Sequence, residues 1–386
     1  MRCSALWRVM VREWRLIIAK PLYPLCMIGM PLLGMLFFAT MLQEGLPEHI
    51  PTAVVDLDNS ALSREFVRQI QSQQAINIVL QCHSYSEACA AMQRNEVYGF
   101  LLLPSRFEAL LSDAKQPTIS FYTNDAYLIP GSLLYECYTT QSMLVSAEVI
   151  QNVLLSLGFP EQRIISILQP LTIDLHALGN PWLNYSVYLS NSFLPTILQL
   201  MILLVTIYTI ATEVKKRRFH SWLLAARSSF LTAIVGKLLV YTLIFIVEGL
   251  LLQAMLYGFM QFPHHTPMWR MALAMVLMVV ATQSVVLIVI SLIPTLSVVY
   301  STVSVIGVVS FSLGGFSFPV PAMYAPFKVL TNLLPVRHYF LIYVNNALNG
   351  YPLYYCRGEY IALIMFVVIA MLLLPRFFSE MRRYGG

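Results

Sequence analysis

The sequence predicts an α-helical polytopic membrane protein with six transmembrane helices and an inserted extracytoplasmic α/β domain. Hydrophobic residues make up 58% of the 386 residues and charged residues only 11%, against roughly 25% charged in an ordinary soluble domain. Several uncharged stretches are long enough to cross a bilayer, and a long segment between the first two of them is acidic. This composition excludes an ordinary soluble enzyme.

Residues 1–20 predict a cytoplasmic interfacial helix. Basic positions alternate there with apolar ones, Trp7 and Trp14 among them, as in helices that lie on a membrane surface. The alternative is a positively charged flank of the first span, and both alternatives keep this segment cytoplasmic.

Transmembrane helices are predicted from uncharged runs, because about 20 apolar residues cross a hydrocarbon core of about 30 Å. The first, residues 21–42, is separated from helices 2–6, which lie within residues 188–386. These five are expected at 189–212, at 238–260, at two positions in the uncharged run 271–327 on either side of Ile293-Pro294-Thr295, and at 360–375. The last is short, so Arg376 is expected to reach toward the headgroups and Phe377 and Phe378 to continue the apolar surface. Prolines from Pro319 onward predict an outer re-entrant hairpin at 319–350.

The distribution of charge predicts the orientation. Residues 43–187 hold six Lys or Arg and fourteen Asp or Glu, a net charge of −8, whereas the rest of the chain carries +13. Fourteen basic residues flank the spans on the side of both termini, and the short loops on the other side hold only Arg270, Lys328, Arg337 and Arg357. Cytoplasmic loops are enriched in Lys and Arg. We therefore expect both termini in the cytoplasm and the insert outside.

The insert, residues 43–187, reads as an α/β domain. Strand-like segments at 52–56, 76–80, 99–103 and 118–122 alternate with helical segments at 61–73, 84–95 and 105–112. Ser84 with Glu87 and Ser105 with Glu108 have the spacing of a capping box at a helix start. This alternation predicts a small domain with a mixed or parallel sheet.

Four cysteines fall on the predicted outer side, where disulfides persist. Cys82 and Cys89 are the pair closest in sequence and are the candidate disulfide, although four cysteines allow three pairings. Buried thiols are the alternative.

Catalytic motifs are not apparent. The only Gly-Lys pair, Gly236-Lys237, is not part of a phosphate-binding loop. No zinc-hydrolase or nucleophile-elbow motif is present, so we expect no catalytic residue, metal site or cofactor in this chain, and no nucleic-acid partner.

The segment between the second and third spans is the main candidate for a partner-binding site. A basic cluster is followed there by an apolar stripe with helical spacing. A coupling helix is therefore predicted within 213–231. One interpretation is a positively charged membrane anchor, and the other is a helix that docks a cytoplasmic partner. The candidate coupling residues are Glu213, Lys215, Lys216, Arg217, Arg218, Trp222 and Leu223.

Polar residues inside the spans are the candidate pathway residues. Glu248 lies near the middle of the third span, where a charge is costly, so we expect it to face protein or water. Asn191, Gln199, Gln253 and Gln283 are neutral, and two interpretations remain open for them, hydrogen bonds between helices and contacts to substrate.

Several segments resemble the ABC-2 family of ABC transporter permeases. The stretch from Glu213 to Tyr241 is similar to that family's cytoplasmic loop and third span, and Gly314 to Pro319 to its fifth span and outer hairpin. Ala53 to Ser60 and Tyr98 to Pro104 resemble the subgroup with a large external domain. One departure is the Arg217-Arg218 pair, which stands where family members commonly have Gly-Thr.

The resemblance implies a permease subunit of an ATP-binding cassette exporter that moves a hydrophobic or amphiphilic substrate outward. A separate cytoplasmic ATPase would hold ATP and magnesium, and the permease would pair with a similar one as a homodimer or heterodimer. The location that the resemblance implies is the inner (plasma) membrane of a bacterium, and a periplasmic adaptor is a further candidate partner. The alternatives are a membrane-anchored sensor or ligand-binding protein, and an ion-coupled transporter that uses Glu248. The sequence does not identify the substrate.

Overall fold

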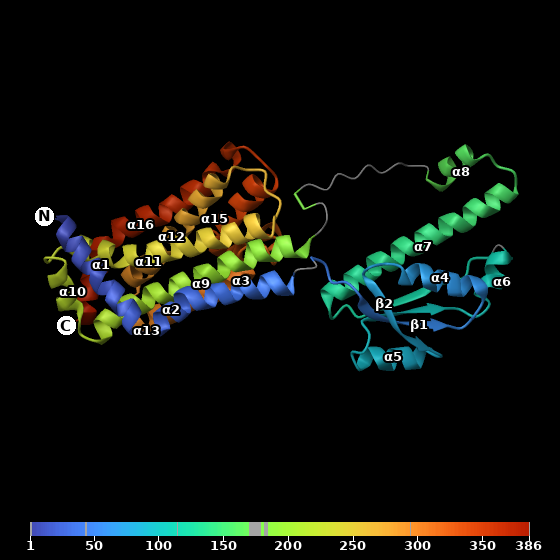
Figure 1. Cartoon of the computed structure of the whole chain (residues 1–386), viewed down its shortest axis with the longest axis horizontal. Helices are drawn as coiled ribbons and strands as arrows, with labels where there is room; N and C mark the ends of the chain where they lie inside the picture. Colours follow the sequence, from blue (N-terminus) through green and yellow to red (C-terminus); the bar gives the residue numbers. More distant parts are fainter. Residues whose placement is uncertain are drawn as a thin grey trace. The chain divides into compact units, whose positions relative to one another are not determined.

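The structure is a computed structural model that describes residues 2–42, 45–113, 115–169, 179–180, 184–293 and 295–385. The chain divides into two compact units (Figure 1). The membrane unit comprises Met1–Gly45 and Ala177–Gly386, and the inserted unit comprises Leu46–His176.

Six helices in the described part of the membrane unit are long and apolar enough to cross a membrane. The first span combines α2 (Leu22–Pro24), the π-helical turn η1 (Leu25–Gly29) and α3 (Met30–Met41), and it follows the amphipathic α1 (Arg2–Ala19). The others are α9 (Tyr185–Lys215), α11 (Phe230–Gln253) with η2 (Ala254–Phe259), α12 (Met268–Leu292), α13 (Leu296–Leu313) and α16 (Leu353–Gly385). The six predicted spans are therefore confirmed, although Pro294 of the predicted turn lies outside the described residues.

The centre of this unit is α9, which packs against α3, α11, α12 and α13. Figure 1 shows α1, α10 (Phe219–Ala225) and both chain ends at one end of the helical bundle. At the other end, the amide of Tyr185 donates a hydrogen bond of 3.0 Å to the carbonyl of Gly45. The chain thus leaves and re-enters the membrane unit at adjacent points, as an inserted domain requires.

Two predicted boundaries are corrected. The sixth span is not a 16-residue helix, because α16 runs from Leu353 to Gly385 and continues through Pro375. The coupling helix does not fill 213–231: α9 extends to Lys215, and only Phe219–Ala225 form α10.

The segment between α13 and α16 is broken into short pieces, as its prolines predict. They are η3 (Val320–Ala322), α14 (Ala325–Thr331), α15 (Pro335–Ile342) and η4 (Tyr343–Leu348). Pro335 stands in the first turn of α15, where its missing N–H costs no helical hydrogen bond. The placement of this segment as an outer hairpin stays a prediction.

The inserted unit contains a mixed sheet in the order β2-β1-β3-β4. Its strands are β1 (Ile50–Asp56), β2 (Ile76–Cys82), β3 (Gly99–Leu103) and β4 (Ser120–Thr123), of which only β4 is antiparallel to its neighbour. The helices are α4 (Ala61–Gln71), α5 (Tyr85–Gln93), α6 (Phe107–Ser112), α7 (Leu128–Ser156) and α8 (Glu161–Leu168).

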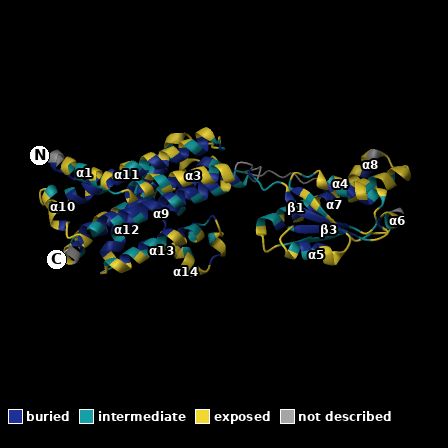
Figure 2. Cartoon of the chain, turned by 60° about the horizontal axis from the view of Figure 1, so that its bottom comes forward, coloured by how far each residue is buried: buried dark blue, intermediate teal, exposed yellow. Residues whose placement is uncertain are grey.

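Side chains of the central strands alternate between two apolar cores, because successive strand residues point to opposite faces. Val54 and Leu101 pack with Phe66 of α4 and Leu134 of α7. Ala53, Val55 and Phe100 pack with Ala88 and Ala91 of α5 on the other face. Figure 2 shows the strands buried between these helical layers. The predicted α/β class is confirmed.

One predicted helix start is wrong. The Ser84 hydroxyl accepts a hydrogen bond from the Glu87 amide at 3.3 Å and caps α5 as expected. Ser105 does not cap α6, which begins at Phe107 after Arg106 in a left-handed conformation. The Glu108 amide instead donates to Oδ2 of Asp58 at 3.1 Å, so an acid from a distant loop caps this helix.

The candidate disulfide between Cys82 and Cys89 is also corrected. Both residues are free cysteines in the structure. Cys82 is buried beside Val97 and Phe100, and Cys89 packs against the same core. Each thiol fills space there as a small apolar side chain, and burial raises the pKa of the Cys82 thiol.

Candidate functional site

Four charged side chains from three helices meet near the end of the bundle that carries α10. Oε2 of Glu213, at the end of α9, accepts from Nη2 of Arg12 on α1 at 2.7 Å. Nζ of Lys237 on α11 lies 2.9 Å from Oε1 of Glu213 and 2.7 Å from Oε2 of Glu13. Arg12 also pairs with Glu13 at 2.7 Å. We call these four residues the charge network.

The charge network is electrically neutral and almost dry. The side chains of Glu13, Glu213 and Lys237 are 0%, 3% and 1% exposed, and that of Arg12 is 20% exposed. Each carboxylate accepts hydrogen bonds from two cationic groups, which offsets the cost of taking ions out of water. Burial alone would lower the pKa of Arg12, but the hydrogen bond and the charge of Glu213 outweigh burial and raise it. The network therefore joins α1, α9 and α11 through buried ion pairs. Loss of any one partner would leave a buried charge unpaired, which is strongly destabilising.

The α10 helix is attached to this network by aromatic packing. Nζ of Lys237 lies 5.3 Å from the centroid of the Trp222 ring, within the range of a cation–π contact. Trp222 is fully buried, and its ring contacts Phe219 and Phe230. Phe230 in turn packs on Phe378 of α16 with ring centroids 4.3 Å apart. Thus α10 is held by α11 and by the C-terminal helix.

A sharp turn carries the chain from α9 to α10. The Arg218 amide donates to the Glu213 carbonyl at 2.8 Å, and the Arg217 amide to the Val214 carbonyl at 2.9 Å. This is the Schellman arrangement that ends many helices, and it needs a left-handed residue, here Arg217 with φ of 49°. Glu213 thus ends α9 with its backbone while its side chain joins the charge network.

The predicted coupling residues divide into two groups. Glu213 and Trp222 are buried and Leu223 is half-buried, so they support α10 from inside. Lys215, Lys216, Arg217 and Arg218 are exposed, as is Leu224 with 58% of its surface accessible. We call these five exposed residues the α10 surface. It presents positive charge beside an apolar side chain, and its role as a docking site stays a prediction.

Sequence reasoning missed three members of the charge network. Glu13, Arg12 and Lys237 were not among the predicted site residues, although Glu13 is the only acid in the first twenty residues. Lys237 lies eight positions into α11 and among apolar neighbours. A lone acid on a basic helix and a lysine inside a span are the two signals that point to a buried pair.

The neutral polar residues of the spans join helices to one another. Asn191 accepts from the Tyr257 hydroxyl at 2.8 Å, and Gln253 donates to the Met271 carbonyl at 2.8 Å. Gln283 accepts from Thr242 at 2.6 Å. These contacts fit the interpretation of hydrogen bonds between helices.

Gln199 joins residues that are further apart in sequence than the pairs above. Its Nε2 donates to the Ser310 hydroxyl of α13 at 2.8 Å, and its Oε1 accepts from the Val336 amide at 2.7 Å. Val336 is in the first turn of α15, where backbone amides have no partner within the helix. Gln199 therefore anchors the broken segment to the central helix.

Glu248 differs from all of these residues. It is 5% exposed, and neither carboxylate oxygen has a hydrogen-bond partner among the residues that the structure describes. It lies on α11 and borders a groove, rather than joining the other predicted pathway residues.

Comparison with known proteins identifies the family. A curated relative, the linearmycin resistance permease protein LnrN of Bacillus subtilis (strain 168), is 29% identical over 109 residues. The aligned part covers 28% of this chain and 28% of that relative. Residues 24–374 match the family described as ABC-2 family transporter protein. The match includes the inserted unit, four whole spans and most of the first and sixth spans. The chain therefore belongs to the ABC-2 family of transporter proteins.

Proposed function

We propose that this chain is the permease subunit of an ATP-binding cassette exporter, which moves a hydrophobic or amphiphilic substrate outward. The family match supports a transport function, and the similar Bacillus protein is a resistance permease. In this proposal a separate ATPase subunit binds ATP and magnesium, and this chain contributes the membrane path and no catalysis.

The observation that carries the proposal is the attachment of the α10 surface to the charge network. The α10 surface combines basic and apolar side chains, which suits binding to a protein partner. Exposed charges alone would bind a partner weakly, because salt screens them. The buried pairs from Glu213 to Arg12 and Lys237 join that surface to three helices at once. A displacement of α10 by a moving ATPase would therefore be transmitted to α1, α9 and α11 as a unit, because packed and ion-paired elements shift together.

The proposal places both termini and the α10 surface in the cytoplasm, and the inserted unit outside a bacterial inner membrane. The location of α10 at the same end of the bundle as both termini supports this orientation (Figure 1). The positive charge of this end supports it as well.

In the assembled exporter, two permease subunits would form the path between them. Ser297 and Ser301 of α13 are exposed and small, and small residues allow a helix of a similar subunit to approach closely. The inserted unit would pass substrate onward, with an adaptor in the periplasm as its receiver. Export that persists after deletion of 50–180 would rule out this role of the inserted unit.

Co-purification tests the main proposal. The full chain, extracted in mild detergent from its own organism, is expected to retain an ATPase that contains a phosphate-binding loop. Reversal of all four charges at Lys215, Lys216, Arg217 and Arg218 to Glu should abolish that retention. Reversal of Lys115 and Arg163, two exposed basic residues of the inserted unit, is the matched control and should leave it unchanged.

Two results would contradict the proposal. If the wild-type chain retains no ATPase while a soluble ligand binds to the inserted unit and alters the helices, the chain is a sensor. If the charge-reversed chain retains the ATPase as well as the control does, the α10 surface is not the docking site.

A further inference from the structure

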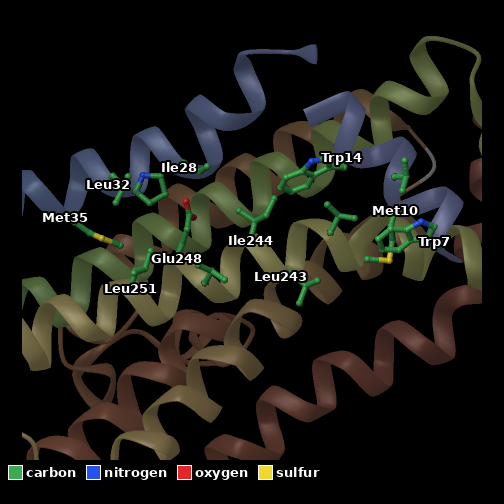
Figure 3. Close-up of a pocket in the computed structure, with 14 residues that line it drawn as sticks. Trp7, Met10, Trp14, Ile28, Leu32, Met35, Leu243, Ile244, Glu248 and Leu251 are labelled. Carbon is green, nitrogen blue, oxygen red and sulfur yellow. The ribbon is translucent and has the colours of Figure 1, made fainter. Parts of the chain in front are cut away.

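A groove lies on the membrane unit between α1, the first span and α11 (Figure 3). Its volume is about 630 Å³, which is within the range of pockets that hold small organic ligands. Thirteen of its fourteen lining side chains are apolar or aromatic, with Trp7 and Trp14 from α1, Leu32 from α3 and Leu243 from α11 among them. The remaining one is Glu248.

The backbone of the first span is irregular beside this groove. Pro31 cannot donate a helical hydrogen bond, and the Met30 amide reaches back five residues to the Leu25 carbonyl, which forms the π-helical turn η1. Ile28 of this turn and Pro31 both line the groove. Turns of this kind occur frequently where a helix borders a functional site.

Glu248 supplies the polar feature that an ordinary lipid-facing surface lacks. Only 5% of its surface is exposed. Figure 3 shows its carboxylate pointing from α11 toward the first span, beside Ile28 and Leu32. Neither oxygen has a partner among the described residues.

A carboxylate in this position would be stabilised by a donor that the described residues do not supply. An unsatisfied polar group in an apolar environment is unfavourable by several kcal/mol, and acids inside membrane spans normally pair with another group. Glu13 and Glu213, in the same unit, each receive donors from Arg12 and Lys237. No cation among the described residues pairs with Glu248, and a cationic group on an occupant of the groove would supply that pair.

We propose that this groove binds a lipophilic ammonium compound, whose apolar body lies along Trp14, Leu32 and Leu243 and whose ammonium group donates hydrogen bonds to the Glu248 carboxylate. Charge-assisted hydrogen bonds are stronger than neutral ones, and the apolar walls strengthen them further by excluding water. The site is a property of this chain alone and does not depend on the proposed ATPase partner.

The test is direct binding to the full chain in phosphatidylcholine nanodiscs. The probe is N-dansyl-1,8-diaminooctane, which has one free ammonium group, and the matched probe is the same molecule with that amine acetylated. Binding is followed by energy transfer to the dansyl group from the tryptophans of the chain, of which Trp7 and Trp14 line the groove. We expect saturable binding of the amine probe and at least about tenfold weaker binding of the acetylated one, the ratio that corresponds to one good charged contact.

Two variants locate the site. Glu248→Gln keeps the size of the side chain and should remove the preference for the amine probe. Val247→Phe fills the groove from α11 and should weaken binding, whereas Leu250→Phe, on an exposed part of α11 that does not line the groove, should not. Thermal unfolding of each variant shows that it remains folded.

Three outcomes would overturn the proposal. Equal affinity for both probes would mean that the groove takes any apolar molecule, such as a lipid chain. Unchanged binding in Val247→Phe would place the probe elsewhere, and this arm is decisive even if Glu248→Gln does not fold. A change of oligomeric state in Val247→Phe, without saturable probe binding in wild type, would mean that a second copy of the chain covers the groove.

Discussion

Nζ of Lys237 on α11 lies 2.7 Å from Oε2 of Glu13 on α1, although 224 positions separate the two residues. The pair is buried, and Glu213 and Arg12 complete its charge balance. This contact attaches the amphipathic N-terminal helix to the third span. It therefore makes α1 part of the structure that supports α10.

Removal of Lys237 should destabilise the membrane unit strongly. In Lys237→Met two buried carboxylates share one guanidinium, and breaking a buried pair costs about 3–5 kcal/mol. Unfolding of the purified chain by denaturant in detergent measures this loss. Lys216→Met, at an exposed position, is the control and should change the free energy of unfolding by less than about 0.5 kcal/mol. Equal effects of the two substitutions would show that the charge network contributes nothing.

Trp222 should matter through packing. Its ring is fully buried between Phe219, Phe230 and Lys237, and truncation of a buried Trp to Ala costs about 3–5 kcal/mol. We expect Trp222→Ala to lower the thermal midpoint markedly and Leu224→Ala, at the exposed neighbour, to leave it near wild type. A similar midpoint for the two variants would contradict the observed packing of α10.

Gln199 and Gln283 offer a ranked comparison with the same substitution. Gln199→Leu removes two hydrogen bonds and leaves the Val336 amide unpaired, whereas Gln283→Leu removes one bond to Thr242. Hydrogen bonds between membrane helices contribute about 0.6 kcal/mol on average, and an orphaned donor adds about 1–3 kcal/mol. Gln199→Leu should therefore be the more destabilising by denaturant unfolding, and the reverse order would contradict this connection.

Asp58 predicts a pH effect in the inserted unit. Hydrogen bonds from Ser60 and from the amide of Glu108 lower the pKa of Asp58. A carboxylate with a lowered folded-state pKa stabilises above its ordinary pKa of about 3.9, and that contribution is lost as pH falls through the folded-state value. Hydrogen exchange should show less protection of α6 in Asp58→Asn than in wild type at pH 6, and equal protection once Asp58 is protonated. A constant difference at every pH would exclude this linkage.

The hydropathy of the sequence and its alternation of strand-like and helical segments predicted the architecture, because both reflect physical requirements on the chain. A bilayer of fixed thickness requires runs such as 21–42, and alternating strand and helix segments require an α/β unit. The start of α16 was predicted seven residues late, at 360 rather than 353. The reason is Glu359, because a charged residue lowers the hydropathy of the segment. In the structure, Oε2 of Glu359 lies 2.5 Å from Nδ1 of His338 on α15, so this charged residue has a partner within the helix bundle.

The candidate site was predicted only in part, because its contacts are not local. The basic cluster at 215–218 is visible in sequence, and it is exposed as a partner-binding surface would be. The side chain of Glu213 is buried because its carboxylate accepts hydrogen bonds from Arg12 and Lys237. No periodicity in the sequence shows that α1 and α11 are neighbours, so the charge network could not be derived from spacing.

The central claim is that the α10 surface contacts an ATPase. A photoreactive p-benzoylphenylalanine at Leu224, which is exposed on α10, should crosslink in intact cells to a protein that contains a phosphate-binding loop, identified by mass spectrometry. The same group at Phe259, which is 84% exposed at the end of η2, should give no such crosslink. An ATPase crosslink from Phe259, or none from Leu224, His220 and Ser221, would contradict the account.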